Sequence, residues 1–187
     1  MPEFLQEIDN SWTLFLDRDG VINKRPPGDY IKTWEEFEFL PGVLESIKIL
    51  TEKFGRIIII TNQQGIGKGL MTHEDLQNIH RQMQTAISKN GGRIDAIYYC
   101  PDLATDEDSC RKPAGFMAIQ AKKDFPEIDF TKSIMAGDTP SDMAFGRNAG
   151  MKTVFINTNN TPVDLSVYDA VFADLPAFAE FITTQKA

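Results

Sequence analysis

The sequence predicts a doubly wound α/β fold, in which a parallel sheet lies between two layers of helices as in a Rossmann-like three-layer sandwich. Short apolar runs alternate with longer segments of helical periodicity along the 187 residues, and this alternation is typical of parallel sheets with helical crossovers. Three of the apolar runs lead directly into polar residues. Right-handed crossovers bring the carboxyl ends of such strands to one edge, so we expect a ligand site there.

Each element is predicted from its local pattern. Short apolar, β-rich runs give the strands, at 13–16, 56–60, 94–99, 133–136, 153–156 and 170–172. Apolar residues at helical spacing give the helices, at 43–54, 72–90, 115–124, 140–149 and 175–184. Pro41 and Gly55 bound the first helix, and a capping-box-like pair, Thr72 and Asp75, begins the second.

The composition is that of a single globular domain, predicted to span residues 1–187, with 1–11 and 184–187 expected to fray. A formal net charge of −8 argues against a nucleic-acid partner, because phosphate backbones require clustered Lys and Arg. The first residues lack the pattern of a signal peptide, and no apolar run approaches the roughly 20 residues that span a bilayer. We therefore expect a cytoplasmic protein without a membrane partner. The sequence leaves the oligomeric state open.

Two carboxylates follow the first predicted strand. Asp17 and Asp19 are two residues apart, and residues i and i+2 of a strand point to the same face. Like charges in one place are unfavourable unless a cation or a reaction uses them. The alternative is a solvated turn, since Asp and Gly20 are ordinary turn residues.

Further polar residues follow two other strands. Thr61-Asn62 comes after the second strand, Asp138 and Asp142 follow the fourth, and Lys112 precedes a helix. Acidic oxygens of this kind suit Mg²⁺, and the lysine would balance the charge of a phosphoryl group. Each residue also has a simpler interpretation. Asp142 would cap the helix that Pro140 begins, Thr61-Asn62 would close a strand, and Lys112 would lie at the surface. His73 and His80 are interpreted as structural.

Taken in order and spacing, four segments resemble the four motifs of the haloacid dehalogenase-like phosphohydrolases. They are Leu16–Gly20, Ile60–Asn62, Arg111–Pro113 and Gly137–Asp142. Asp17–Asn23, Thr61–Gly67 and Tyr98–Pro101 more narrowly resemble the branch that contains the heptose 1,7-bisphosphate and histidinol-phosphate phosphatases.

The resemblance implies Mg²⁺-dependent hydrolysis of a phosphomonoester through an aspartyl-phosphate. The implied substrate is a small phosphorylated sugar, D-glycero-D-manno-heptose 1,7-bisphosphate, which would lose its 7-phosphate. Histidinol phosphate and, less well, a polynucleotide 3′-phosphate are the alternative substrates. An inactive binding domain is the alternative outside enzymes.

The resemblance also implies a role for each site residue. Asp17 would be the nucleophile and Asp19 the general acid and base. Thr61 and Lys112 would hold the transferred phosphoryl group. The implied metal ligands are Asp17, Asp19 (through its carbonyl), Asp138 and Asp142. The implied contacts to the rest of the substrate are Asn62, Gln63, Gln64 and Arg111. Beside the resemblance, the basic residues of the loops, Arg25, Lys68 and Arg111, are our candidates for holding a second phosphate.

The cysteine loop departs from the family. Relatives of this branch commonly carry a zinc site of the form Cys-x-His, a gap, and Cys-x-Cys before Arg-Lys-Pro. This chain retains Cys100 and Cys110, but Asp102 and Asp108 stand at the other two positions. Structural zinc prefers four Cys or His ligands, so we expect no zinc and two free thiols, because disulfides are rare in the cytosol.

The spacing of the motifs leaves no room for the cap domain that many relatives insert. Only 37 residues separate Gly20 from Ile57, and a helix uses many of them. The capless form assigns substrate specificity to short loops. These loops are 23–32, 63–71 and 100–112.

Overall fold

The computed structural model describes residues 2–162, 164 and 167–184. Its strands form one six-stranded sheet in the order β3-β2-β1-β4-β5-β6, and every neighbouring pair is parallel. The strands are β1 (Thr13–Leu16), β2 (Arg56–Asn62), β3 (Ala96–Cys100), β4 (Ser133–Gly137), β5 (Lys152–Ile156) and β6 (Ala170–Phe172). The predicted doubly wound α/β fold is confirmed.

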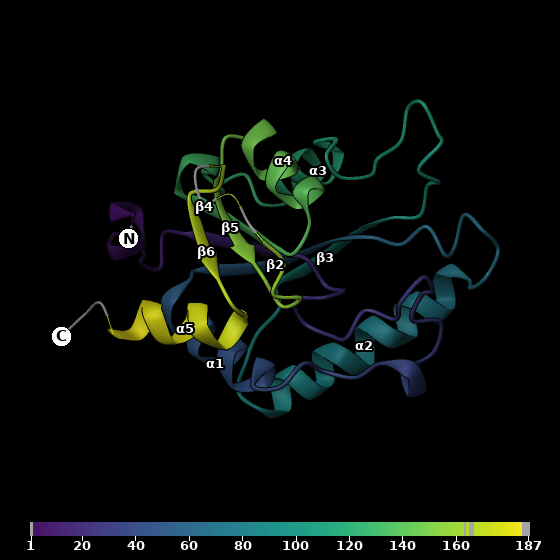
Figure 1. Cartoon of the computed structure of the whole chain (residues 1–187), viewed down its shortest axis with the longest axis horizontal. Coiled ribbons are helices and arrows are strands. Elements are labelled where there is room, and N and C mark those ends of the chain that lie inside the picture. Colours follow the sequence, from purple (N-terminus) through teal and green to yellow (C-terminus); the bar gives the residue numbers. More distant parts are fainter. Residues whose placement is uncertain (1, 163, 165–166, 185–187) are drawn as a thin grey trace.

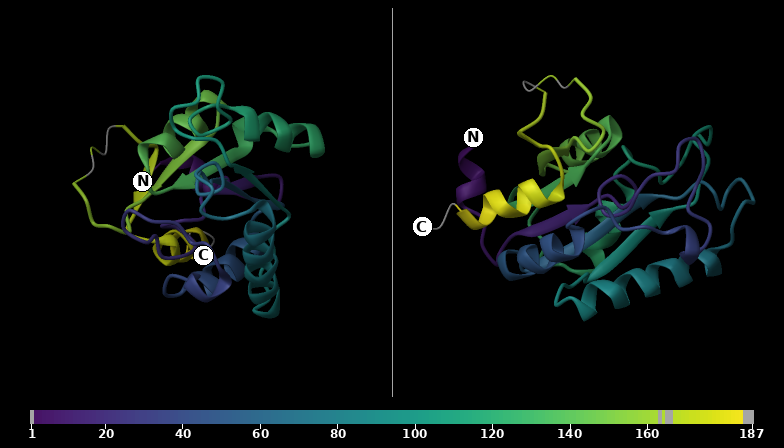
Figure 2. Two further views of the ribbon diagram at one scale, coloured as in Figure 1. Left: turned by 90° about the vertical axis from the view of Figure 1, so that its right-hand side faces the viewer. Right: turned by 60° about the horizontal axis from the view of Figure 1, so that its bottom comes forward.

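Helices cover both faces of the sheet (Figure 1). α1 (Val43–Lys53), α2 (His73–Lys89) and α5 (Leu175–Thr184) lie on one face, and α3 (Phe116–Asp124) and α4 (Pro140–Asn148) lie on the other. The two further views in Figure 2 show the same three layers. No helix of the described residues is long and apolar enough to cross a membrane.

The alternation of side chains along each strand explains the two helical layers. Leu14 and Leu16 of β1 pack into the core beneath α1, α2 and α5, whereas Phe15 packs into the core on the side of α3 and α4. In β2, Ile57 and Ile59 likewise face the first core, and Ile58 and Ile60 the second. All of these side chains are fully buried, so both faces of the sheet are covered and neither is exposed to solvent at these strands.

The topology places a ligand crevice at the carboxyl end of β1. The chain winds outward from β1 to β2 and β3 in one direction, and from β4 to β6 in the other. The order of the strands therefore switches between β1 and β4, which pair in register from Thr13 opposite Ser133 to Leu16 opposite Ala136. Sheets of this type bind ligands just beyond the carboxyl ends at such a switch point.

Two predicted boundaries move by two residues, and the others move by one residue or not at all. β2 extends through Thr61 and Asn62, because both residues pair with the end of β3. β3 begins at Ala96 rather than at residue 94, because Asp95 uses both its main-chain N–H and its carboxylate to bond the main chain of Ile57. The strand pairing starts only after this contact.

The N-terminal segment, which the sequence led us to expect to fray, packs against the core over the residues that the structure describes. The 3₁₀ helix η1 (Glu3–Gln6) and the turn after it bury Phe4, Leu5 and Ile8 against the core, and Phe4 stacks on Trp12 with 6.3 Å between ring centroids. Burial of these apolar side chains offsets the entropy of ordering the segment. At the other end, Thr184 completes α5, and residues 185–187 lie outside the described residues.

Candidate active site

The ends of β1 and β4 bring Asp17 and Asp138 together. Asp17 continues β1, and its N–H donates to the carbonyl of Ala136 in β4 at 3.0 Å. Asp138 follows β4 directly. Carboxylate oxygens of Asp17, Asp138 and Asp142 all lie within 4.8 Å of one another. The predicted clustering of these carboxylates is therefore present in the structure.

Lys112 provides the positive charge at this cluster. Its buried ammonium lies 2.8 Å from Asp17 Oδ1 and 2.6 Å from Asp142 Oδ1, and it donates to the carbonyl of Ile60 at 2.7 Å. Burial lowers the pKa of Lys112, but Asp142 and Asp17 outweigh that effect and hold the pKa above its usual value. Lys112 is thus an ionised site residue and not a solvated surface lysine.

Asp142 combines the two interpretations that the sequence left open. Its Oδ2 accepts from the N–H and hydroxyl of Thr139, at 3.0 and 2.6 Å, and completes a capping box at the start of α4. Its Oδ1 holds Lys112. Because both oxygens already have partners in the protein, the geometry favours Asp142 as the anchor of Lys112. Direct coordination of a metal by Asp142 remains a prediction.

The surroundings of Asp17 and Asp138 favour the protonated form of both carboxyl groups. Burial is the main cause that raises the pKa of Asp17 to about 6, against the opposing charge of Lys112. Burial, followed by the charge of Asp17, raises the pKa of Asp138 to about 8. A bound cation would remove this penalty, since it favours the ionised form of each carboxylate.

The backbone next to the cluster is shaped for close approach. Gly20 has a φ of +93°, and a Cβ built on it would lie 2.1 Å from Asp138 Oδ2. A side chain at residue 20 would therefore push Asp138 out of the group. Buried carboxylates together with an adjacent main-chain carbonyl form a donor set of hard oxygens, which fits Mg²⁺.

Asp19 faces a different environment from Asp17. The Arg18 guanidinium donates to Asp19 Oδ1 and Oδ2 at 2.9 and 3.0 Å, and the amides of Asn23 and Gln63 add bonds of 2.9 and 2.8 Å. Burial raises the pKa of Asp19, but the charge of Arg18 and these hydrogen bonds outweigh it and hold the pKa below its usual value. Asp19 is therefore held as a carboxylate.

Sequence reasoning missed the residues that hold Asp19. Arg18 is 0% exposed and lies 3.1 Å from His80 Nε2, measured from Nη1. An arginine always donates, so the neutral imidazole accepts this bond. Burial and the charge of Arg18 lower the pKa of His80 to about 3. Two features of the sequence could have indicated this contact. Arg18 lies between Asp17 and Asp19, and His80 lies among the apolar residues of α2.

The polar residues at and just after the end of β2 hold other residues of the site in place through hydrogen bonds. Asn62 Oδ1 accepts from the N–H of Lys112 at 3.0 Å and so fixes the main chain of that lysine. Gln63 is only 1% exposed, and its amide donates to Asp19 and to Thr61 Oγ1. The structure thus places Gln63 behind the site, whereas the sequence predicted that it contacts substrate.

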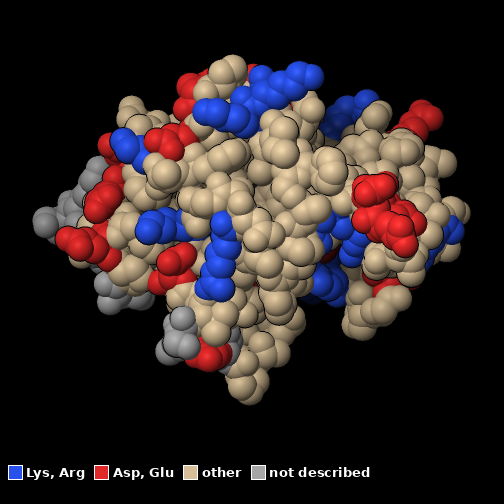
Figure 3. Space-filling model, turned by 90° about the horizontal axis from the view of Figure 1, so that it is seen from above, with Lys and Arg blue, Asp and Glu red and all other residues tan. Residues whose placement is uncertain are grey.

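A pocket of about 390 Å³ opens over the carboxylates. Its lining includes Asp17, Asp19, Asp142, Lys112, Arg25, Asn62, Gln64, Arg111 and Tyr30. The space-filling view shows a hollow on its right-hand side, with Lys and Arg side chains on one side of it and Asp and Glu side chains on the other (Figure 3). Arg25, Arg111 and Lys112 of this lining offer positive charge to an anionic substrate, although the net charge of the chain is −8.

The loops place the remaining predicted contacts around this pocket. Gln64 donates to the hydroxyl of Tyr30 at 2.6 Å and accepts from Ala104, so it joins the three loops that were predicted to give specificity. The ammonium of Lys68 lies over the ring of Tyr30, 5.3 Å from its centroid. Arg25 reaches past the rim and bonds Asp138 at 2.9 Å.

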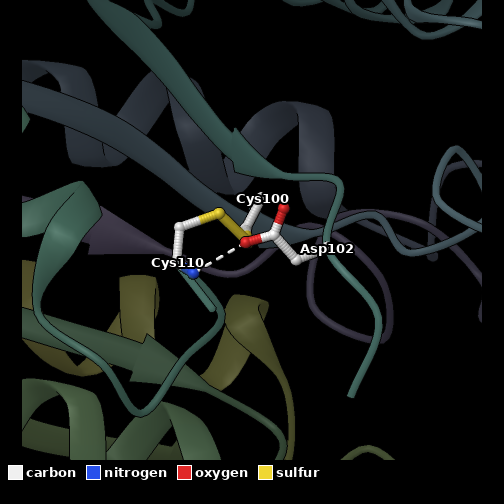
Figure 4. A group of neighbouring side chains, drawn as sticks. All are labelled: Cys100, Asp102 and Cys110. Atoms are coloured by element: carbon white, nitrogen blue, oxygen red, sulfur yellow. Dashed lines mark hydrogen bonds between the residues drawn. A yellow bond between two sulfur atoms is a disulfide. The ribbon is translucent and has the colours of Figure 1, made fainter. Parts of the chain in front are cut away.

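The cysteine loop differs from its prediction. Cys100 and Cys110 form a disulfide with a Cα–Cα distance of 5.6 Å, so the expectation of two free thiols is wrong. Asp102 accepts a hydrogen bond from the N–H of Cys110 at 2.8 Å, and this bond joins the two ends of the loop beside the disulfide (Figure 4). The end of β3 and the residue before Arg111 are adjacent in the fold, which the spacing in the sequence did not reveal.

Solved structures of phosphatases share this architecture. The D,D-heptose 1,7-bisphosphate phosphatase of B. bronchiseptica, complexed with magnesium and phosphate, superposes with a TM-score of 0.82 at 28% identity, over 93% of this chain and 99% of that one. Fold and site together are those of a haloacid dehalogenase-like phosphatase.

Sequence relatives agree with this class. The family model for the polynucleotide kinase 3 phosphatase matches residues 12–185, and the chain belongs to that family. A D-glycero-alpha-D-manno-heptose-1,7-bisphosphate 7-phosphatase of Mycobacterium bovis is 39% identical over 74% of this chain and 73% of its own. A D-glycero-beta-D-manno-heptose-1,7-bisphosphate 7-phosphatase of Helicobacter pylori is 36% identical over 82% and 87%.

Proposed function

We propose that this phosphatase removes the 7-phosphate of D-glycero-D-manno-heptose 1,7-bisphosphate with the help of Mg²⁺. One observation carries the catalytic part. The Asp17 carboxylate is held by the buried Lys112 ammonium beside Asp138, in a pocket that Arg25 and Arg111 also line. The substrate follows from relatives of 39% and 36% identity that carry this activity in their names.

In the proposed reaction, Asp17 attacks phosphorus and the bond to the sugar oxygen breaks. This gives an aspartyl-phosphate, which water then hydrolyses to inorganic phosphate. Lys112 lies within hydrogen-bond distance of Asp17 and would neutralise charge on the transferred group. The Thr61 hydroxyl, which accepts from the Gln63 amide at 2.9 Å, would add a further donor to the transferred group.

The residues that would hold Mg²⁺ are Asp17 and Asp138 through their carboxylates and Asp19 through its carbonyl. When bound, the ion would neutralise charge on the phosphoryl oxygens and hold Asp17 in its ionised form. Asp142 lies beside this set and supports it through Lys112.

Asp19 is proposed as the acid and base. The donors that surround it favour its ionised form, which suits the second step, in which a carboxylate takes a proton from water. In the first step, Asp19 must first take up a proton and turn from Arg18 toward the leaving sugar oxygen. The bond to Arg18 therefore favours the carboxylate form of Asp19, which is the form that acts as a base.

We further propose that the chain works as one capless domain in the cytoplasm. Substrate specificity would then come from the loops that carry Arg25, Gln64, Lys68 and Arg111. Fractionation of the producing cells, with the chain detected by immunoblot in the cytoplasmic and the remaining fractions, tests the location; recovery outside the cytoplasmic fraction would refute it.

Steady-state kinetics on a panel of phosphates test the substrate. The panel comprises the alpha and beta anomers of heptose 1,7-bisphosphate, histidinol phosphate and an oligonucleotide with a 3′-phosphate, each with and without Mg²⁺. We expect the highest kcat/KM on a heptose bisphosphate and no turnover without a divalent cation. A higher kcat/KM on histidinol phosphate or on the oligonucleotide would refute the substrate.

A further inference from the structure

Arg25 bonds the same oxygens that are proposed to hold the metal. Its Nη2 donates to the main-chain carbonyl of Asp19 at 2.5 Å and to Asp138 Oδ1 at 2.9 Å, and it lies 3.5 Å from Asp17 Oδ2. Its Nε lies 3.2 Å from the same carbonyl of Asp19. One guanidinium therefore contacts one carbonyl and two carboxylates, all three from the proposed ligand set.

A guanidinium and a divalent cation cannot use these oxygens together. Mg²⁺ requires ligands at about 2.0–2.1 Å in near-octahedral geometry, and Arg25 Nη2 already lies within 3.5 Å of an oxygen of each of the three residues, in the space that the ion would need. The two groups also carry the same sign of charge and repel at this range. Binding of the ion therefore requires the Arg25 side chain to leave.

The structure leaves Arg25 a route out of the cluster. Its side chain is 43% exposed, and it comes from the loop between β1 and η2 (Trp34–Glu36) rather than from a helix or strand. Arg25 also lines the pocket, together with Pro26, Tyr30 and Arg111. A rotation about its side-chain bonds thus moves the guanidinium from the carboxylates into the space where an anionic substrate would lie.

We propose that Arg25 and the divalent cation exclude each other at Asp17, Asp19 and Asp138, and that the displaced guanidinium binds the phosphate that the substrate retains. The second half rests on the proposed function. A planar guanidinium bonds phosphate through two parallel N–H groups, which suits this contact. By linkage, a bisphosphate that binds Arg25 also tightens the binding of the ion.

Calorimetric titration with MgCl₂ alone tests the competition without turnover. Arg25→Gln removes the competing charge, so we expect its Mg²⁺ dissociation constant to fall by about fivefold or more. Lys24→Gln is the matched control. It makes the same change of charge at the adjacent residue, whose ammonium pairs with Glu38 at 2.5 Å and does not reach the carboxylates. Equal affinities of wild type and Arg25→Gln, or an equal gain in Lys24→Gln, would overturn the proposal.

Kinetics at saturating Mg²⁺ test the second half. We compare kcat/KM on heptose 1,7-bisphosphate with that on heptose 7-phosphate, which lacks the retained phosphate. Arg25→Gln should reduce this ratio by about tenfold, the usual effect of one lost charged hydrogen bond. An unchanged ratio would refute the phosphate contact. The two proposals can fail separately. If Arg25→Gln binds Mg²⁺ more tightly but the wild type turns over no heptose bisphosphate, the proposed function and the phosphate contact are refuted and the competition is not.

Discussion

Asp17 and Asp19 lie two residues apart and have opposite electrostatic surroundings. Burial and neighbouring carboxylates raise the pKa of Asp17, whereas Arg18 and two amide donors lower that of Asp19. Pairs of acids with pKa values displaced in opposite directions are typical of sites that divide two roles between them. The two carboxylates are thus distinguished by their contacts, Asp17 with the Lys112 ammonium and Asp19 with the Arg18 guanidinium, and a bound cation would hold Asp17 in the ionised form that a nucleophile needs.

The nucleophile is tested by Asp17→Asn. The amide keeps the shape of the carboxylate but cannot attack phosphorus, so we expect phosphate release to fall by about 10³-fold or more. Circular dichroism should show a retained fold, because Lys112 keeps Asp142 and the carbonyl of Ile60 as partners. Glu45→Gln, an equivalent change on the exposed side of α1, is the control. Retained turnover in Asp17→Asn would refute the assignment.

His80 predicts how stability depends on pH. Its pKa is about 3 in the folded protein and near 6.5 when unfolded, so between these values the unfolded state binds more protons. Stability from this residue is present above pH 6.5 and is lost as pH falls toward 3, at up to about 1.4 kcal/mol per pH unit. His80→Gln cannot titrate, so its free energy of unfolding should fall less steeply with acid in urea titrations.

The matched control for that series is His73→Gln, at the exposed start of α2. It should keep the steep dependence of the wild type. If His80→Gln and the wild type show parallel curves between pH 4 and 6.5, the imidazole is not held neutral by Arg18.

The buried Arg18 could not be predicted from its position in the sequence. Arginine is rarely buried without partners, and its partners are Asp19 in the next position and His80 in α2, 62 residues away. Only the packing of α2 on the sheet brings the imidazole to the guanidinium. The carboxylates Asp17 and Asp138 were predictable, because both follow buried strands and parallel topology aligns strand ends.

At the scale of elements, the loop between β3 and α3 depends on the Cys100–Cys110 disulfide. The bridge joins the last residue of β3 to the residue that precedes Arg111 and Lys112. It therefore ties two pocket residues to the sheet at the point where regular structure ends. Spacing alone could not decide between this bridge, free thiols and a metal, because the choice depends on how the loop returns to β3.

Removal of the bridge should lower stability. Closure of a loop of this length is worth roughly 2–3 kcal/mol by chain entropy, so we expect the Cys100→Ser/Cys110→Ser double variant to unfold at a lower urea concentration. A reducing agent should destabilise the wild type by a similar amount and leave the double variant unchanged. Thiol titration of the unfolded, unreduced wild type should find no free thiol. Two reactive thiols in that assay would contradict the bridge.

At the scale of the whole molecule, the class of fold followed from alternating patterns, but the order of the strands did not. β3 and β6 are the edges of the sheet because the chain returns to the centre after β3, places β4 beside β1 and then winds outward on the other side. The first eleven residues carry no periodic pattern, so their docking was not predictable from local propensity. Phe4, Leu5 and Ile8 nevertheless complete the core on the face that holds α5.

This N-terminal docking predicts that a substitution far from the pocket destabilises the entire domain. Leu5 is 2% exposed in η1, so Leu5→Ala leaves a cavity and should cost about 2–4 kcal/mol, which lowers the Tm by roughly 5–15 °C for a domain of this size. Leu70→Ala makes the same change at a side chain that is 51% exposed, and should shift the Tm by less than about 2 °C. Equal Tm values for the two variants would mean that the first residues do not contribute to the core. A loss confined to Leu5→Ala would show that the N-terminal segment is part of the folding unit.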